Sequence, residues 1–226
     1  MRFDTDKIQK LEEKIGYVFN DKHWLERALT HSSTNDSFNY QRLEFLGDRV
    51  LGLVIADALF DKFKKENEGG LAKRHTALVQ GRMCAQIGQN IDLGNFIIFS
   101  ESERQSGGQK NDNIIADVME SLLGAIYIDG GFENVKKIIL SLWGDNLLTL
   151  RTAPQDPKTE LQEWAQARAL ALPDYQVADR KGPDHAPVFI IQLKVEGQAD
   201  VKAEGASRRQ AEKKAARLML RQVKDL

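Results

Sequence analysis

Residues 40–65 form a long segment in which apolar and polar positions alternate with a helical period. The apolar positions recur every three or four residues: Leu43, Leu46, Val50, Leu53, Val54 and Ala58. That spacing predicts one helix with a single face packed in a core. The same periodicity predicts further helices around residues 5–15, 22–30, 70–88, 112–128 and 132–149, separated by Gly and Asn clusters. We therefore expect an all-helical (all-α) domain over residues 1–151.

The pattern changes at residues 152–157, where two prolines lie among polar residues, as is typical of a linker. A short amphipathic helix is expected from residue 158, followed by segments that alternate with the period of a strand. The strand positions expected on a buried face are Phe189, Ile191, Leu193, Val195, Ala199, Val201 and Ala203. A basic helix over residues 207–224 closes the chain, and its expected core face is Ala211, Ala215, Leu218 and Gln222. This α-β-β-β-α order predicts a small α+β domain over residues 158–226.

Composition narrows the class of protein. The chain of 226 residues has a formal net charge of −1 and a single cysteine, Cys84. One cysteine excludes an intrachain disulfide and a cysteine-based metal site, so carboxylates remain as metal ligands. No apolar run approaches the roughly 18 to 20 residues of a membrane span, and the polar first residues do not resemble a signal peptide. We expect a cytoplasmic protein with no membrane partner and with a local basic surface at residues 207–224.

Two pairs of acids interrupt the apolar helices. Glu44 and Asp48 are four residues apart, and Asp117 and Glu120 are three apart, so each pair lies on one face of its helix. If the two helices pack together, four carboxylates converge, which a partly buried site tolerates only when cations neutralise them or their pKa values rise. Alternatively, each acid is solvated or paired with a neighbouring Arg or Lys. Spacing alone indicates an acidic site for Mg²⁺ or Mn²⁺ of undefined purpose.

The residues around these acids resemble the ribonuclease III family. The segment QRLEFLGD at residues 41–48 is similar to the signature segment of that family. Four other segments follow in the family's order and approximate spacing: LTHSS at 29–33, NEGG at 67–70, SGGQK at 106–110 and IIADVMESLLGAIYID at 114–129. The C-terminal segments KTELQEW, GPDHAPVF and SRRQAEKKAA resemble a double-stranded-RNA-binding domain. The resemblance covers nearly the whole chain.

This resemblance implies a divalent-metal-dependent endoribonuclease that hydrolyses double-stranded RNA, including rRNA and mRNA precursors. Its products would carry 5′-phosphate and 3′-hydroxyl ends with short 3′ overhangs. The implied metal ligands are Glu44, Asp48, Asp117 and Glu120, of which Asp48 and Glu120 would be catalytic. The expected cofactor is Mg²⁺, for which Mn²⁺ can substitute, and no organic cofactor is expected. The divalent ions themselves can activate water for phosphodiester hydrolysis, so no His base is needed.

The resemblance also implies two accessory residues in the cleft, Gln41 and Glu68. Many members of the family carry Glu at the position of Gln41. The amide in this chain is a poor anionic ligand but can hydrogen-bond RNA or a metal-bound water.

The partners implied by the resemblance are double-stranded RNA and a second copy of the chain. The expected RNA contacts are Gln162, Glu163, His185, Ser207, Arg208, Arg209 and Lys213. The start of the last helix favours phosphate through its free backbone N–H groups and its positive dipole end. The helix that contains RLEFLGD is expected to pair with its copy in a homodimer, so that each of two sites cuts one strand.

Two other functions remain open from the sequence. A noncatalytic RNA-binding protein that kept the fold would bind duplex RNA without cutting it. A helical carboxylate-metal hydrolase acting on nucleotides would leave the C-terminal domain without a role.

Overall fold

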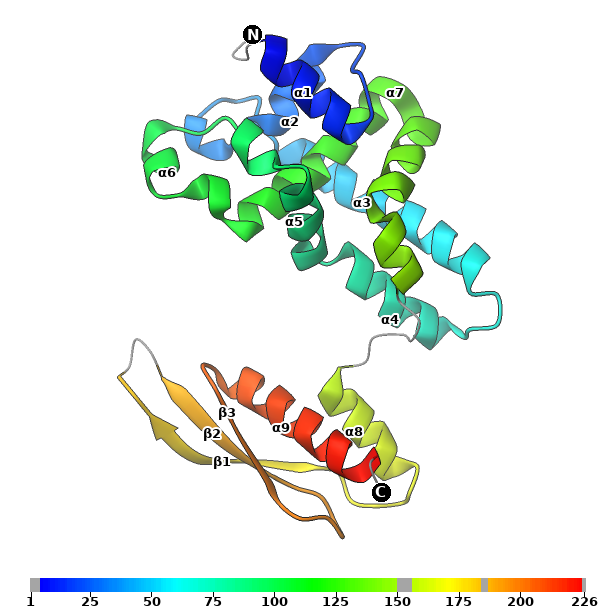
Figure 1. The fold of residues 1–226 in the computed structure, drawn as a ribbon, viewed down its shortest axis with the longest axis vertical. Coiled ribbons are helices and arrows are strands. Elements are labelled where there is room, and N and C mark those ends of the chain that lie inside the picture. The colour runs from blue at the N-terminus through cyan, green and yellow to red at the C-terminus, as the bar shows by residue number, and fades with distance from the viewer. Residues whose placement is uncertain (1–4, 150–155, 184–186, 225–226) are drawn as a thin grey trace. The chain divides into compact units, whose positions relative to one another are not determined.

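The computed structural model describes residues 5–149, 156–183 and 187–224. The chain divides into two compact units, residues 1–154 and residues 155–226 (Figure 1). Helix α8 begins at Pro157, inside the segment expected to link the domains, because Asp156 caps its first turn and proline suits the first helical position. Residues 152–155 of that segment lie outside the described residues. No helix among the described residues has the length and apolar character needed to cross a membrane.

The first unit is helical throughout. Its helices are α1 (Thr5–Ile15), α2 (Lys22–Leu29), α3 (Gln41–Lys62), α4 (Glu68–Val79), α5 (Gly81–Asn90), α6 (Glu101–Gln105) and α7 (Asp112–Thr149). Short 3₁₀ turns occupy Ser32–Thr34, Leu93–Phe96 and Gly108–Lys110. Helices α3 and α7 pack against each other over much of their length (Figure 1). The predicted all-helical class is confirmed.

The structure divides one predicted helix in two, confirms one predicted break and adds one short helix. The single helix expected over residues 70–88 is two helices, because Gln80 has ψ 147° and ends α4 before α5 begins. The break expected near residue 130 is confirmed, because Gly131 has φ 79° inside α7, a conformation that favours glycine. Short helix α6, which the periodicity did not predict, begins at Glu101 with Ser100 as its N-cap.

The expected core face of α3 is wrong at Leu53 and only partly buried at Leu46 and Ala58. Leu43, Val50 and Val54 are buried, whereas the side chain of Leu53 is 59% exposed. Leu53 follows the same side of the helix as two other exposed apolar residues, Phe45 and Phe60. Helix α3 therefore carries apolar residues on two separate faces. One face packs in the core of this unit, and the other is exposed.

Polar groups tie the ends of this helical core together. The indole Nε1 of Trp143, which is fully buried on α7, donates to the carbonyl oxygen of Leu78 at 2.9 Å. The carboxylate of Asp129 accepts from the hydroxyl of Tyr17 at 2.6 Å and from the backbone N–H of Asp21 at 2.9 Å. Burial tends to raise the pKa of Asp129, but these hydrogen bonds outweigh burial and lower it.

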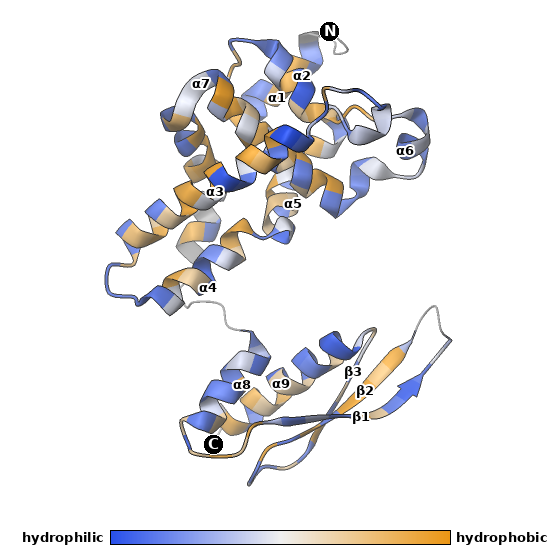
Figure 2. Ribbon diagram, turned by 180° about the vertical axis from the view of Figure 1, so that it is seen from behind, coloured by the Kyte–Doolittle hydropathy of each residue, from blue (hydrophilic) through white to orange (hydrophobic). Residues whose placement is uncertain are grey.

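The second unit has the predicted α-β-β-β-α order. Helix α8 (Pro157–Gln166) precedes strands β1 (Asp174–Lys181), β2 (Val188–Lys194) and β3 (Val201–Gly205), and α9 (Arg208–Lys224) follows. The strands form one antiparallel sheet in the order β1-β2-β3, with an irregularity in the register between Val177 and Asp179. In Figure 2, β2 is mostly hydrophobic and β1 mostly hydrophilic, consistent with a sheet that packs one face against α8 and α9.

Most of the predicted core positions of this unit are correct. Ile191, Leu193 and Val195 are buried, as are Val201 and Ala203, and Phe189 packs against them. Ala199 is exposed and precedes β3, so that prediction is wrong.

The predicted face of α9 is correct at Ala211 and Ala215 but wrong at Leu218, which is 43% exposed. Gln222 is only partly buried. The buried face continues instead through Ala216, Met219, Leu220 and Val223. The buried face of α9 is therefore wider than the predicted one, which contained only positions spaced three or four residues apart.

Candidate active site

Two glycines bring the backbones of α3 and α7 into direct contact. A Cβ atom built on Gly47 would lie 1.7 Å from the carbonyl oxygen of Glu120. One built on Gly124 would lie 2.3 Å from the carbonyl oxygen of Leu43. Side chains at either position would push the helices apart, so glycine is what permits this approach. The contact places the first turns of α3 against the part of α7 that carries the second acid pair.

Three of the four predicted carboxylates have raised pKa values, and the charge of the fourth, Asp48, contributes to two of these shifts. Burial, then the charges of Asp48, Asp117 and Glu44, raise the pKa of Glu120 to about 7. Burial, then the charges of Asp117 and Asp48, also raise the pKa of Glu44. The pKa of Asp117 is raised mainly by burial. These shifts record a partly desolvated region of negative potential, where a proton or a cation is favoured.

The four carboxylates are neighbours without forming a ligand set in this structure. Among the residues that the structure describes, no group of three or more His, Cys, Asp or Glu side chains is arranged to hold a metal ion. Asp48 forms an ion pair with Arg49. For this acid the structure shows the alternative in which a neighbouring Arg or Lys pairs with the carboxylate. Both side chains of that pair are substantially exposed, and exposed ion pairs contribute little free energy, so Asp48 can exchange its partner.

The chemistry of the four side chains fits a hard divalent cation. These side chains offer only carboxylate oxygens as metal ligands, which Mg²⁺ and Mn²⁺ prefer. Their repulsion, evident in the raised pKa values of Glu44 and Glu120, would be offset by two positive charges.

Two uncharged donors, which the sequence analysis did not identify, contact the carboxylates of α7. The hydroxyl of Tyr40 donates to Oδ2 of Asp117 at 3.4 Å. The thiol of Cys84, on α5, donates to the carbonyl oxygen of Val79 at 3.8 Å and lies near enough to Glu120 to lower the pKa of that carboxyl, against the larger effect of burial. Both donors are buried, Tyr40 at 6% exposure and Cys84 at 0%. The only signal in the sequence was the position of Tyr40 directly before QRLEFLGD; nothing local marked Cys84.

The two accessory residues lie in other surroundings. Glu68 is exposed in the first turn of α4, and Gln41 is exposed at the start of α3. Neither is among the charges or hydrogen bonds that shift the pKa values of the four carboxylates in the described chain. Both remain predictions as accessory residues of a cleft.

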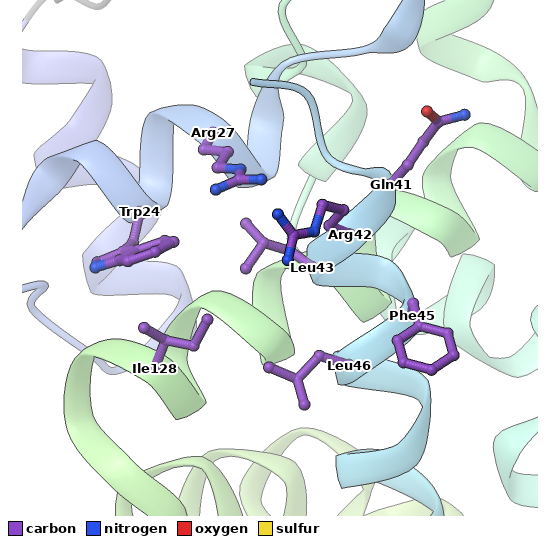
Figure 3. Close-up of a pocket in the computed structure, with 8 residues that line it drawn as sticks. All are labelled: Trp24, Arg27, Gln41, Arg42, Leu43, Phe45, Leu46 and Ile128. Carbon is purple, nitrogen blue, oxygen red and sulfur yellow. The ribbon is translucent and has the colours of Figure 1, made fainter. Parts of the chain in front are cut away.

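An open pocket of about 600 Å³ lies beside the start of α3. Its lining is formed by Trp24, Arg27, Gln41, Arg42, Leu43, Phe45, Leu46 and Ile128. Figure 3 shows the guanidinium groups of Arg27 and Arg42 directed toward each other, while the side chain of Gln41 points away from them. Apolar side chains from α2, α3 and α7 make up the rest of the wall (Figure 3).

In the second unit, several predicted RNA-binding cations are paired with acids. Arg208 Nε lies 2.8 Å from Glu212 Oε1 on the same helix. Lys213 Nζ lies 2.6 Å from Asp156 Oδ2, at the start of α8. Arg209 is exposed at the first turn of α9. The Lys213–Asp156 pair thus joins α9 to the start of α8, whereas the Arg208–Glu212 pair lies within α9.

The other predicted RNA contacts vary in how the structure places them. Gln162 and Glu163 are exposed on α8. The hydroxyl of Ser207 accepts from the backbone N–H of Gln210 at 3.2 Å and so caps the start of α9. His185 lies outside the described residues.

Comparison with known proteins assigns both units to described families. Residues 21–145 match a family model described as ribonuclease-III-like, and residues 157–223 match the double-stranded RNA binding motif. A protein named ribonuclease 3 from Ehrlichia canis is 45% identical over 222 residues, which cover 96% of this chain and 98% of that protein. The ribonuclease 3 of Caulobacter vibrioides is 46% identical over 218 residues, covering 94% of each chain.

A solved structure agrees with the first unit. The nuclease domain of ribonuclease III from Campylobacter jejuni superposes with a TM-score of 0.60 at 45% identity, covering 62% of this chain and 97% of that one. That structure was described for flexibility in a region involved in dimer formation.

Proposed function

The chain belongs to the ribonuclease III family and is an endoribonuclease for double-stranded RNA; from that premise we propose that the carboxylates of α3 and α7 hold the divalent cation needed for cleavage. The observation that carries the proposal is the backbone contact at Gly47 and Gly124. Because of that contact, two acid pairs distant in sequence share one partly buried region.

The proposed ligands are Glu44, Asp48, Asp117 and Glu120. When bound there, a divalent cation would lower the pKa of a water molecule and stabilise charge on the leaving 3′-oxygen. Asp48 and Glu120 are the proposed catalytic residues because the segments that carry them, QRLEFLGD and IIADVMESLLGAIYID, resemble the corresponding segments of the family. After burial, the charge of Asp48 is the largest cause that raises the pKa of Glu120. Mg²⁺ is the proposed ion, and Mn²⁺ would substitute for it because both prefer carboxylate oxygens.

The second unit is proposed to hold the RNA through phosphate and 2′-hydroxyl contacts, the mode by which such modules read the shape of a duplex. Arg209 is exposed, while Arg208 and Lys213 are each paired with a carboxylate. Phosphate would therefore compete with Glu212 and Asp156 for these two cations. The affinity for RNA should depend on the number of basic residues and should fall as the salt concentration rises, because these cations contact phosphate.

The test of the function is metal removal in the presence of a long RNA duplex. With Mg²⁺ the full chain is expected to release short duplexes with 5′-phosphate ends, and with EDTA the duplex should remain intact. A single strand of the same sequence serves as the control substrate and should persist. Duplex that is bound but uncut in both Mg²⁺ and Mn²⁺ would support the noncatalytic alternative.

The proposed assembly is a homodimer formed along α3. Phe45, Leu53 and Phe60 are 65%, 59% and 75% exposed and follow one side of that helix. Three large apolar groups on one helix face are unusual for a surface that meets only water. The pocket beside Phe45 offers a partly apolar recess next to the same stripe. A second copy placed along α3 could bury both features by symmetry.

Replacing Phe45 with Asp is expected to shift the protein from dimer to monomer, because the change puts a charge on the exposed apolar stripe of α3 that forms the proposed seam. Sedimentation equilibrium at micromolar concentration should report about twice the 25.5 kDa chain mass for the parent and the single mass for the variant. Val18→Asp is the matched control, since Val18 is 71% exposed and lies outside α3. A Phe45→Asp variant that stays dimeric would exclude this surface.

A further inference from the structure

Tyr40 occupies a fixed position at the entrance to α3. Its backbone N–H donates to the carbonyl oxygen of Thr30 at 3.0 Å, and its own carbonyl accepts from Glu44 N at 2.9 Å. Its ring stacks on that of His31, with centroids 5.5 Å apart and planes 16° apart. His31 in turn contacts the ring of Phe99. Both the backbone and the ring of Tyr40 are therefore held, and only the hydroxyl remains to be oriented.

The hydroxyl of Tyr40 has a defined acceptor. It donates to Oδ2 of Asp117 at 3.4 Å. A phenol has an ordinary pKa near 10, so this donor keeps its proton at neutral pH. The contact spans 77 residues of sequence and joins the start of α3 to the acid pair of α7.

We infer that Tyr40 is a positioning residue for metal binding: its hydroxyl engages Oδ2 of Asp117 and so leaves Oδ1 as the oxygen available to a cation. This inference rests on the proposed function, in which Asp117 is a metal ligand. Carboxylates that bind metals are commonly oriented by a second hydrogen bond, and loss of such a partner typically costs about 10- to 100-fold in metal affinity or activity.

The geometry separates this role from a role in folding. At 3.4 Å the Tyr40–Asp117 contact is longer than the usual O–H···O range of about 2.5 to 3.0 Å, so it contributes little to stability. Removal of the oxygen alone keeps the ring and its stacking on His31. The effect of Tyr40→Phe should therefore appear in metal affinity while the stability of the metal-free protein changes little.

The experiment compares Tyr40→Phe with Tyr17→Phe in the full chain. Tyr17 is the matched control because its hydroxyl also donates to a carboxylate, Asp129 at 2.6 Å, in another part of the unit. The first readout is the half-saturating Mn²⁺ concentration in a calorimetric titration of the metal-free protein, without RNA. The second is the Mn²⁺ dependence of duplex cleavage, with the rate at saturating metal recorded separately.

For Tyr40→Phe we expect the half-saturating Mn²⁺ concentration to rise by about tenfold in both readouts. Its cleavage rate at saturating Mn²⁺ should stay within about threefold of the parent, because added metal compensates for weaker binding. Tyr17→Phe should lower the melting temperature of the metal-free protein and leave the half-saturating concentration unchanged.

The outcomes distinguish failure of the proposed function from failure of the role inferred for Tyr40. A parent that shows no metal-dependent cleavage overturns the proposed function itself. A parent that cuts with metal while Tyr40→Phe keeps the parent's half-saturating concentration overturns only the role of Tyr40. An equal rise in both Tyr→Phe variants would mean that a general loss of stability, and not the contact with Asp117, weakens metal binding, which also overturns it.

Discussion

Replacing Glu120 with Gln is expected to reduce duplex RNA cleavage by at least about 10³-fold while raising the melting temperature of the metal-free protein. The loss of cleavage follows because an amide replaces the most strongly perturbed carboxylate of the proposed metal site. Binding of duplex RNA should persist, since the RNA-binding motif matches residues 157–223. If one substitution both abolishes cleavage and stabilises the fold, the Glu120 side chain serves catalysis at the expense of stability.

The gain in stability follows from the sign of the pKa shift. Burial and neighbouring carboxylates raise the pKa of Glu120 from 4.5 to about 7 in the folded protein. Folded protein therefore keeps Glu120 protonated up to about pH 7, whereas the unfolded chain loses this proton near pH 4.5. Folding is opposed progressively more as the pH rises from 4.5 to 7, and below 4.5 the group has no effect. Allowing for solvent screening, we expect a gain of about 1 kcal/mol, or about 2 to 4 °C, for Glu120→Gln above pH 7.

Thermal unfolding in EDTA from pH 4.5 to 8, together with cleavage assays in Mg²⁺, measures both effects. Glu133→Gln is the control, because Glu133 is an exposed glutamate within α7 and lies outside the acid cluster. It should leave cleavage and stability unchanged. A Glu120→Gln variant that cuts at the parent's rate would remove Glu120 from the active site.

Replacing Gly47 with Ala is expected to lower the free energy of unfolding by about 3 to 5 kcal/mol. The added Cβ would lie 1.7 Å from the backbone oxygen of Glu120, and backbone of a packed helix cannot turn aside as a side chain can. Helices α3 and α7 would have to separate. Because the obstructing atom belongs to Glu120, the same movement would displace a proposed catalytic residue.

Gly52→Ala is the matched control on the same helix. Its added Cβ would approach His75 Nε2 at 3.7 Å, an ordinary contact, so the variant should equal or exceed the parent by up to about 1 kcal/mol through helix propensity. Urea denaturation followed by circular dichroism measures both variants. If Gly47→Ala folds with the parent's stability, the backbone contact between α3 and α7 is not as close as described.

The local pattern of the sequence predicted most of the elements and the residue types of the candidate site. Helical periodicity placed α3 and α7, and the spacing within each acid pair placed its two carboxylates on one face. These features follow from the 3.6-residue turn, so neighbours in sequence suffice to define them. The glycines of α3 looked alike in sequence, yet Gly47 contacts backbone and Gly52 meets only the edge of a side chain.

Tertiary structure alone decided which atoms meet across the chain. It directed Leu53 to the surface and brought the hydroxyl of Tyr40 to Asp117. The physical reason is that a periodic pattern defines the faces of a helix but not the neighbours packed against each face. Contacts between residues far apart in sequence depend on the side-chain volumes and backbone approach of both partners, which no single segment contains.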